Sequence, residues 1–176
     1  MTIGTLDWRE AAGRPDLLAE PVARAVEDLG AAAGVRVAEI DPALADTAAF
    51  CERYGVRPDE SANCVIVAAK RAGEIRYAAC VVLATARADV NGAVRRHLGA
   101  RKISFAPQDD AVTLTGMEYG GITPLGLPEE WPVLVDEAVA AHPGVVVGSG
   151  VRRSKLALAG AVLAGLGSAE VLPLAN

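Results

Sequence analysis

The sequence predicts an α/β protein of the α+β type, built on a mixed β-sheet. Two apolar segments, residues 62–70 and 75–84, are separated by Arg-Ala-Gly-Glu, and this spacing around Gly73 predicts a β-hairpin. Both segments are apolar on nearly every residue, so we expect the two strands to lie centrally in their sheet. Helical and strand-like segments alternate irregularly around the hairpin, which favours a mixed sheet over a doubly wound parallel one.

The segments before the hairpin predict two helices and one strand. Residues 15–30 carry apolar side chains at helical spacing, which predicts an amphipathic helix interrupted near Pro21 and ended by Gly30. Residues 35–40 read as a strand. Asp41 followed by proline then predicts a capped helix that continues to residue 55.

After the hairpin the expected elements are shorter. Short helices are predicted over 89–99 and 107–116, with a strand over 102–106 between them. Residues 117–131 are rich in glycine and proline and are expected to form an ordered loop. Three strands and a last helical segment are expected to follow, over residues 133–139, 145–148, 155–158 and 159–167.

Composition restricts the class of protein. The 176 residues are 52% hydrophobic but only 4% aromatic, which predicts one globular domain over 1–176 with a core of Ala, Val and Leu. No signal-peptide pattern or membrane-length apolar run is present, so a cytoplasmic protein without membrane contact is expected. The three cysteines are expected to be free thiols.

The charge distribution argues against broad, tight binding of nucleic acid. The net charge is −5 and the pI is about 5.1. Two local basic clusters are nevertheless present, one over 95–102 and one over 152–155, and each is either a solvated surface or a binding surface.

Two glycine-containing stretches are the candidate binding loops. In residues 120–124 (Gly-Gly-Ile-Thr-Pro), the glycines allow close backbone approach, so N–H groups can face an oxyanion or a carboxylate; a tight turn is the alternative. Gly148-Ser149-Gly150 follows an apolar strand, with Arg152 two residues on, and is either a phosphate or ribose contact or a bend. Asp136 is either a general base or a strand-end cap.

No cofactor or metal site is predicted. The P-loop and Gly-x-Ser-x-Gly patterns are absent from the sequence. The two histidines, His97 and His142, do not have metal-ligand spacing. Cys64 lies inside an apolar run, which favours a packed side chain over a nucleophile.

Residues 104–128, SFAPQDDAVTLTGMEYGGITPLGLP, resemble the YbaK/EbsC family, which includes prolyl-tRNA editing proteins. The order of the hairpin, the glycine-rich stretch, the strand ending at Asp136 and the glycines at 148–150 extends the resemblance over about 20–172. It implies a mixed, partly barrel-like sheet with flanking helices. It also implies hydrolysis of mischarged aminoacyl-tRNA, with Gly120 and Gly121 in catalysis and Ile122, Thr123 and Pro124 around the substrate.

The sequence departs from the family pattern at two positions. Family members carry a lysine at the start of the first hairpin strand, where this chain has Asn63, and an aspartate where it has Lys155. The hypothesis is that the two positions face each other and that the cation now comes from Lys155. The resemblance then implies a deacylase acting in trans, with Asn63 and Lys155 as positioning groups.

The resemblance implies specific partners as well as an activity. The terminal adenosine would lie near Gly148–Gly150. The tRNA acceptor end would bind weakly and in a salt-sensitive manner, and a synthetase is a further partner that the family allows. Two alternatives remain open: a catalytically silent binding module for aminoacyl-tRNA, and a hydrolase of another small ester or amide.

Overall fold

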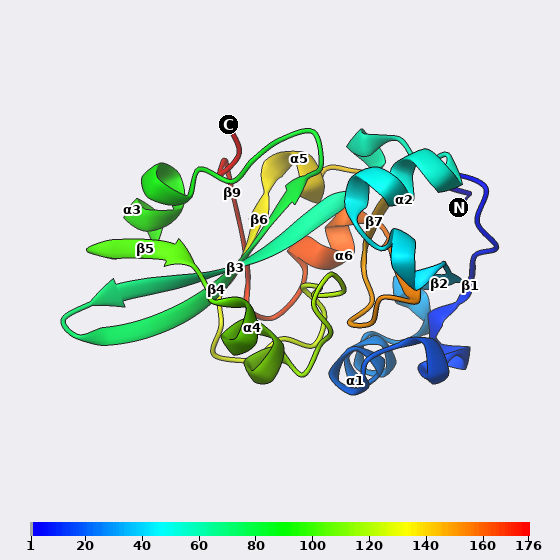
Figure 1. Ribbon diagram of the computed structural model, residues 1–176, viewed down its shortest axis with the longest axis horizontal. Helices are drawn as coiled ribbons and strands as arrows, with labels where there is room; N and C mark the ends of the chain where they lie inside the picture. Colours follow the sequence, from blue (N-terminus) through cyan, green and yellow to red (C-terminus); the bar gives the residue numbers. More distant parts are fainter. Residues whose placement is uncertain (1) are drawn as a thin grey trace.

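Two β-sheets with helices on their faces form residues 2–176, the part of the chain that the computed structural model describes (Figure 1). The first sheet is antiparallel and has the order β1 (Arg9–Glu10), β2 (Arg36–Glu39), β8 (Ser154–Leu158) and β7 (Val145–Gly148). The second has the order β5 (Lys102–Phe105), β3 (Ala62–Arg71), β4 (Glu74–Leu83), β6 (Val133–Asp136) and β9 (Ala169–Leu172). In the second sheet β4, β6 and β9 are parallel, and the other pairs are antiparallel. The expected mixed α+β fold with flanking helices is therefore confirmed, although no closed barrel forms in the described chain.

Six α-helices accompany the sheets in the described residues: α1 (Glu20–Leu29), α2 (Thr47–Tyr54), α3 (Arg95–His97), α4 (Gln108–Thr115), α5 (Glu137–Ala140) and α6 (Gly160–Ala164). Further helical turns of the 3₁₀ or π type precede or join them at Ala11–Gly13, Pro15–Leu17, Ala31–Ala33, Pro42–Leu44, Pro58–Glu60 and Val90–Val94. Helix α1 packs on one face of the first sheet and α2 packs on the opposite face.

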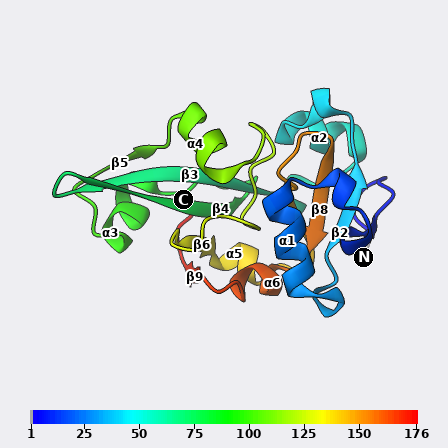
Figure 2. The same ribbon diagram turned by 90° about the horizontal axis from the view of Figure 1, so that it is seen from below.

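The β3–β4 hairpin has the predicted position and turn. Its register runs from Ala62 opposite Leu83 to Arg71 opposite Glu74, so the connection consists of two residues. Ala72 and Gly73 both have positive φ, 50° and 80°, as a tight hairpin turn requires. Both strands are central in their sheet, and their far end extends away from the half of the molecule that contains α1 and α2 (Figures 1 and 2).

Some predicted boundaries were wrong, for local reasons. The helical stretch over 15–30 is interrupted near Pro21, as predicted, but its first part is only the turn Pro15–Leu17; α1 begins at Glu20, with Pro21 in its first turn, where the missing N–H costs nothing. Asp41 accepts a bond from the Ala43 N–H but caps only the turn Pro42–Leu44; α2 begins at Thr47.

Other differences concern elements too short to have a clear pattern. The expected strand over 133–139 stops at residue 136, and the helix α5 follows. The strands β1 and β9 were not predicted. Both have few residues and depend on pairing with β2 and β6, which lie far away in the sequence.

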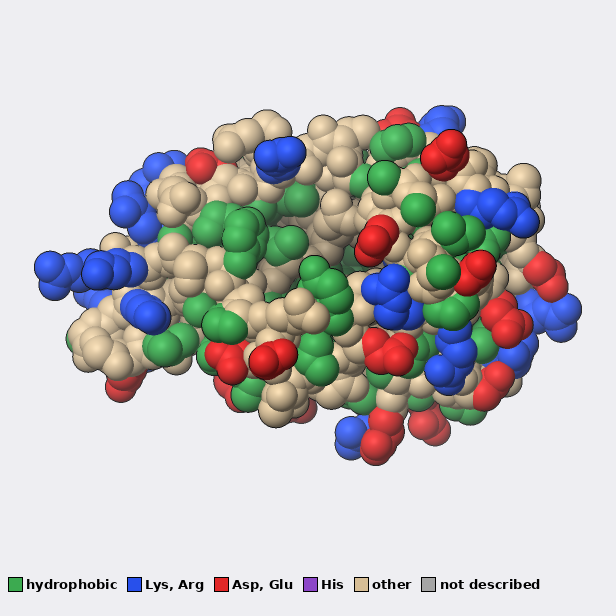
Figure 3. Space-filling model, in the orientation of Figure 1, with side chains coloured by type: hydrophobic (Ala, Val, Ile, Leu, Met, Phe, Trp, Pro, Cys, Tyr) green, Lys and Arg blue, Asp and Glu red, His purple; other side chains and the backbone are tan. Residues whose placement is uncertain are grey.

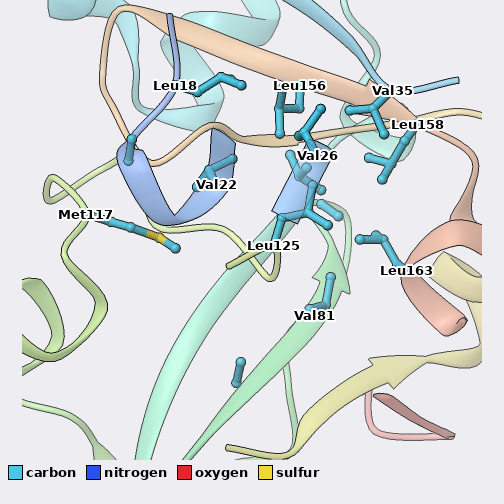
Figure 4. Close-up of a cluster of buried hydrophobic side chains, with 14 of the residues drawn as sticks. Leu18, Val22, Val26, Val35, Val81, Met117, Leu125, Leu156, Leu158 and Leu163 are labelled. Carbon is cyan, nitrogen blue, oxygen red and sulfur yellow. The ribbon is translucent and has the colours of Figure 1, made fainter. Parts of the chain in front are cut away.

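One hydrophobic cluster continues from one sheet to the other (Figure 4). Val22 and Val26 of α1 contact it from one side, and Leu163 of α6 contacts it from another. Leu125, from the loop over 117–131, lies between the sheets and is completely buried. The loop is therefore held by the core itself, which fixes its backbone in place.

Asp136 lies at the end of β6 and acts as a structural cap. Its carboxylate accepts bonds from the N–H groups of Ala138, at 3.1 Å, Leu174, at 3.0 Å, and Ala175, at 3.1 Å. The residue is 7% exposed. These bonds join α5 to the C-terminal segment, which supports the cap interpretation rather than the general-base one.

Substituting Asp136→Asn is expected to lower the free energy of unfolding by about 1–2 kcal/mol, because an amide replaces one of the two acceptor oxygens. Urea denaturation measures this change. Glu137→Gln, at the neighbouring exposed position, is the control and should leave the midpoint within experimental error of the wild type. Equal midpoints for both variants would contradict the structural role.

Candidate functional site

Two glycine-containing loops lie against each other, backbone to backbone. We name residues 116–126 the glycine loop and residues 148–153 the strand-end loop. The Gly150 N–H donates to the Gly121 oxygen at 2.7 Å, and the Glu118 N–H donates to the Gly150 oxygen at 2.8 Å. A Cβ on Gly121 would lie 2.8 Å from the Val151 nitrogen, and one on Gly148 would lie 2.6 Å from the Gly121 oxygen. Glycine is thus required here by close packing of the two loops.

Arg152 joins the two loops to the segment before α2. Its backbone N–H donates to Glu118 Oε1 at 2.8 Å, and its Nη1 donates to the Tyr119 oxygen at 3.2 Å. Its Nε donates to the Pro42 oxygen at 3.2 Å. Gly120 has a φ of +83°, and a Cβ there would lie 2.2 Å from Arg152 Nη1. The guanidinium therefore fills the space next to Gly120 and fixes the shape of the glycine loop.

Asn63 and Lys155 both contact the chain at the beginning of α2. Thr47 Oγ1 donates to Asn63 Oδ1 at 2.7 Å. Lys155 Nζ donates to the Ala45 oxygen at 2.9 Å. Their partners are two residues apart in the sequence. An isolated bridge between Ser61 and Val146 connects the start of β3 to β7, next to β8.

The ammonium group of Lys155 lies in an apolar environment. The residue is 8% exposed, and its Nζ lies 5.2 Å from the centroid of the Phe50 ring. Burial lowers the pKa of Lys155 to about 8; nearby Arg152 lowers it further, whereas Cys51 and Asp46 act in the opposite direction. A lysine with this pKa exchanges its proton close to neutral pH.

Backbone donors are available on the glycine loop. Among residues 2–176, the N–H groups of Gly120 and Ile122 have no hydrogen-bond acceptor, and both residues are partly exposed. Figure 3 shows a hollow near the middle of the face that Figure 1 presents, where the ribbon has the start of β3 and the loop over 117–131. The geometry therefore offers fixed N–H donors on a loop that Arg152 holds in place.

Several predicted binding residues are enclosed in the protein. Ser149 is completely buried, and its hydroxyl accepts from Ser154 Oγ at 2.7 Å and donates to the Val151 oxygen at 3.0 Å. Gly150 has a φ of +85° and packs against Ala19. The contacts favour the bend interpretation for these two positions. Gly148 is partly exposed.

Thr123 and Pro124 are also buried. Thr123 is 0% exposed, and its Oγ1 has no partner among the described residues. A buried hydroxyl without a partner lowers stability, because it has lost its hydrogen bonds to water.

Thr123→Val is therefore expected to raise the free energy of unfolding by about 1 kcal/mol, since valine keeps the shape and removes the unpaired hydroxyl. Urea denaturation measures the change. Thr123→Ser, which keeps the hydroxyl and removes a methyl group, should instead lower it by about 1 kcal/mol. A destabilised Thr123→Val variant would show that the hydroxyl has a partner in solution.

The cysteines are free, as expected, and they are poor nucleophiles in this structure. Burial raises the pKa of the Cys80 thiol to about 12 and also raises the pKa values of Cys64 and Cys51. No group of three or more His, Cys, Asp or Glu side chains suited to a metal ion occurs within residues 2–176. Over the same residues, no helix is long and apolar enough to span a membrane.

The sequence did not indicate the surroundings of Lys155. Ala45, Thr47 and Phe50 have no distinctive spacing, and they reach the site only because α2 packs across the first sheet. Glu118 was also missed, although its position within the glycine loop is a usable signal.

The fold and the site define a class of protein: a mixed α+β domain with a glycine loop held beside a buried lysine. A family model described as aminoacyl-tRNA editing domain matches residues 41–166. The chain belongs to that family, which confirms the resemblance to the YbaK/EbsC group.

Solved structures agree with this fold. A candidate trans-editing enzyme for prolyl tRNA synthetase superposes with a TM-score of 0.76 at 22% identity, covering 90% of this chain and 96% of the other. The hypothetical protein APE2540 gives a TM-score of 0.74 at 24% identity, covering 86% and 99%. A structure from a study of epitope backbone grafting onto scaffold proteins gives 0.76 at 22% identity, covering 90% and 97%.

Proposed function

We propose that the protein is a trans-acting deacylase that hydrolyses the ester bond of mischarged aminoacyl-tRNA. The observation that carries this proposal is that the N–H groups of Gly120 and Ile122 have no acceptor among residues 2–176, on a loop that Arg152 holds in place. Membership of the editing-domain family supports it. The solved candidate trans-editing enzyme of similar fold is consistent with an activity outside a synthetase.

Ester hydrolysis requires few protein groups. A water oxygen attacks the carbonyl carbon, the bond from that carbon to the ribose oxygen breaks, and a proton passes to the ribose oxygen. The negative charge that develops on the carbonyl oxygen is stabilised by fixed backbone donors, the part we assign to Gly120 and Ile122. Positioning of the water and exclusion of bulk solvent supply much of the remaining rate enhancement.

Lys155 and Asn63 position the substrate in this proposal. Both side chains are fixed by the beginning of α2, through Ala45 and Thr47. The Asn63 amide nitrogen has no acceptor among residues 2–176 and can donate to a substrate, because the bond from Thr47 uses the amide oxygen. Lys155 and Arg152 supply positive charge on one side of the site, which suits the phosphate of the terminal nucleotide.

The test is release of amino acid from a panel of correctly and incorrectly charged tRNAs. Wild-type protein is expected to hydrolyse at least one mischarged species. Lys155→Met and Asn63→Ala are each expected to lower kcat/KM roughly 10- to 100-fold, since each removes a charged or polar contact to the substrate.

Arg24→Gln, an exposed substitution on α1, is the control and should retain wild-type activity. Salt-dependent tRNA binding without hydrolysis would contradict the deacylase proposal. It would support the catalytically silent binding module, in which Asn63 stands where family members have a lysine. Hydrolysis of small aminoacyl esters but of no charged tRNA would favour the second alternative, a hydrolase of another small ester or amide.

A further inference from the structure

The far end of the β3–β4 hairpin carries a concentrated positive charge. Seven exposed residues form a surface that we name the basic arm: Lys70, Arg71, Arg76, Arg95, Arg96, Arg101 and Lys102. They come from the hairpin end, α3 and the start of β5. Seven of the 17 Lys and Arg residues therefore lie in segments 70–76 and 95–102, which contain one acidic residue, Glu74. Figure 3 shows Lys and Arg side chains gathered at this end of the molecule.

The basic arm differs from the rest of the surface in its ion pairing. Within residues 2–176, six of the seven arm residues make no salt bridge, and Arg76 pairs with Glu74 at 3.7 Å. On the opposite half of the molecule Arg9 pairs with Asp7 and Arg14 pairs with Asp16, each at 2.8 Å, and Arg24 and Arg57 also form ion pairs. The arm charges are therefore available to an external anion.

The fold brings these like charges together. Lys70 lies directly opposite Lys102 on adjacent strands, a pairing that repels without a counterion. Arg71 Nη1 donates to the Gly99 oxygen at 3.4 Å, which directs its guanidinium toward the segment that follows α3. A surface hollow of about 630 Å³ is lined by Arg71, Ala72, Arg95, Arg96, Gly99, Ala100 and Arg101. Four guanidinium groups around one hollow match an array of phosphates.

We propose that the basic arm binds the phosphate backbone of a double-stranded RNA stem, the acceptor stem of the tRNA. This inference rests on the proposed function. Lys70 is seven residues from Asn63 along β3, or about 23 Å. In this proposal the ester lies at the Asn63 end, the single-stranded 3′ tail runs along β3, and the duplex beyond it reaches the arm.

Charge complementarity favours RNA as the occupant. The chain as a whole has a charge of −5, so the surface outside the arm is acidic on balance and repels a polyanion, while the arm attracts it. This asymmetry orients the RNA during the encounter. Guanidinium groups bind phosphate through paired N–H donors, and phosphate contacts carry no base specificity.

The experiment measures binding of an uncharged RNA hairpin, with a duplex stem and a single-stranded 3′ tail, by fluorescence anisotropy at several salt concentrations. The test variant is the triple substitution Arg95→Gln, Arg96→Gln and Arg101→Gln. The control, Arg9→Gln, Arg24→Gln and Arg53→Gln, removes the same charge from exposed positions on the other half. The test variant is expected to bind roughly 10- to 100-fold more weakly at low salt, with a log–log salt slope shallower by about 2–3.

Kinetics separate this inference from the proposed function. The test variant should raise KM for charged tRNA and leave hydrolysis of an aminoacyl adenosine, which has no stem, at the wild-type rate. Loss of binding in the test variant, with no hydrolysis by any protein, would support the arm and overturn the deacylase. Equal affinities and salt slopes for the two triple variants would overturn the arm proposal, as would wild-type binding to anionic phospholipid vesicles but not to RNA.

Discussion

Replacing Gly121 by alanine is expected to lower the free energy of unfolding by about 3 kcal/mol and to abolish deacylation by the folded protein. The added Cβ would lie 2.8–2.9 Å from the N, C and O atoms of Val151, which are backbone atoms and cannot rotate away. Separating the loops would stretch the 2.7 Å bond from the Gly150 N–H to the Gly121 oxygen. The change would also displace the N–H groups of Gly120 and Ile122. Urea denaturation and hydrolysis of the mischarged tRNA measure the two effects.

Gly167→Ala is the matched control, because a Cβ there would have no atom within 4 Å. Its stability should stay within about 0.5 kcal/mol of the wild type. Gly148→Ala tests the same interface from the other side, since its Cβ would lie 2.6 Å from the Gly121 oxygen. If Gly121→Ala and Gly148→Ala both unfold at the wild-type urea concentration, the close packing of the two loops is wrong.

The sequence predicted the parts of the fold in which local and tertiary preferences agree. The β3–β4 hairpin has long apolar strands and a glycine at a turn position that requires positive φ, so its pattern was unambiguous. Helix α4 begins after Pro107 and ends before Gly116. Gly116 has the left-handed conformation, with a φ of 69°, which glycine adopts readily. The strand β9 has only four residues and is fixed by its parallel register with β6, which sequence periodicity cannot indicate.

The site was less predictable, because its polar groups meet through tertiary packing. The glycine loop and the strand-end loop were each recognisable, but their contact depends on glycines nearly 30 residues apart. The hypothesis that Asn63 and Lys155 belong to one site gains support from their shared contact with the beginning of α2. Burial of Ser149 and Thr123 was not foreseen, since short polar residues beside glycines are equally typical of exposed turns.

The buried ammonium of Lys155 is expected to make stability depend on pH. The pKa of Lys155 is about 8 in the folded protein and 10.5 in its ordinary state. Between these values the unfolded chain holds a proton that the folded chain has released, so the free energy of unfolding rises with pH. This gain in the free energy of unfolding comes from deprotonation of Lys155. It is fully present above pH 10.5, is lost as the pH falls to 8, and amounts to about 3 kcal/mol. Urea denaturation of the wild type and of Lys155→Met from pH 7 to 10.5 measures it.

The difference between the two stability curves isolates Lys155 from other groups that titrate in this range. The free energy of unfolding of Lys155→Met minus that of the wild type should fall by about 3 kcal/mol as the pH rises from 8 to 10.5. Gly167→Ala, which changes no titratable group and adds a Cβ with no atom within 4 Å, should give a curve parallel to the wild type. Cys51 interacts with Lys155, so the comparison is repeated with Cys51→Ser in both proteins. Parallel curves for Lys155→Met and the wild type would show that the ammonium remains hydrated. Lys155 would then carry its charge without the burial that lowers its pKa.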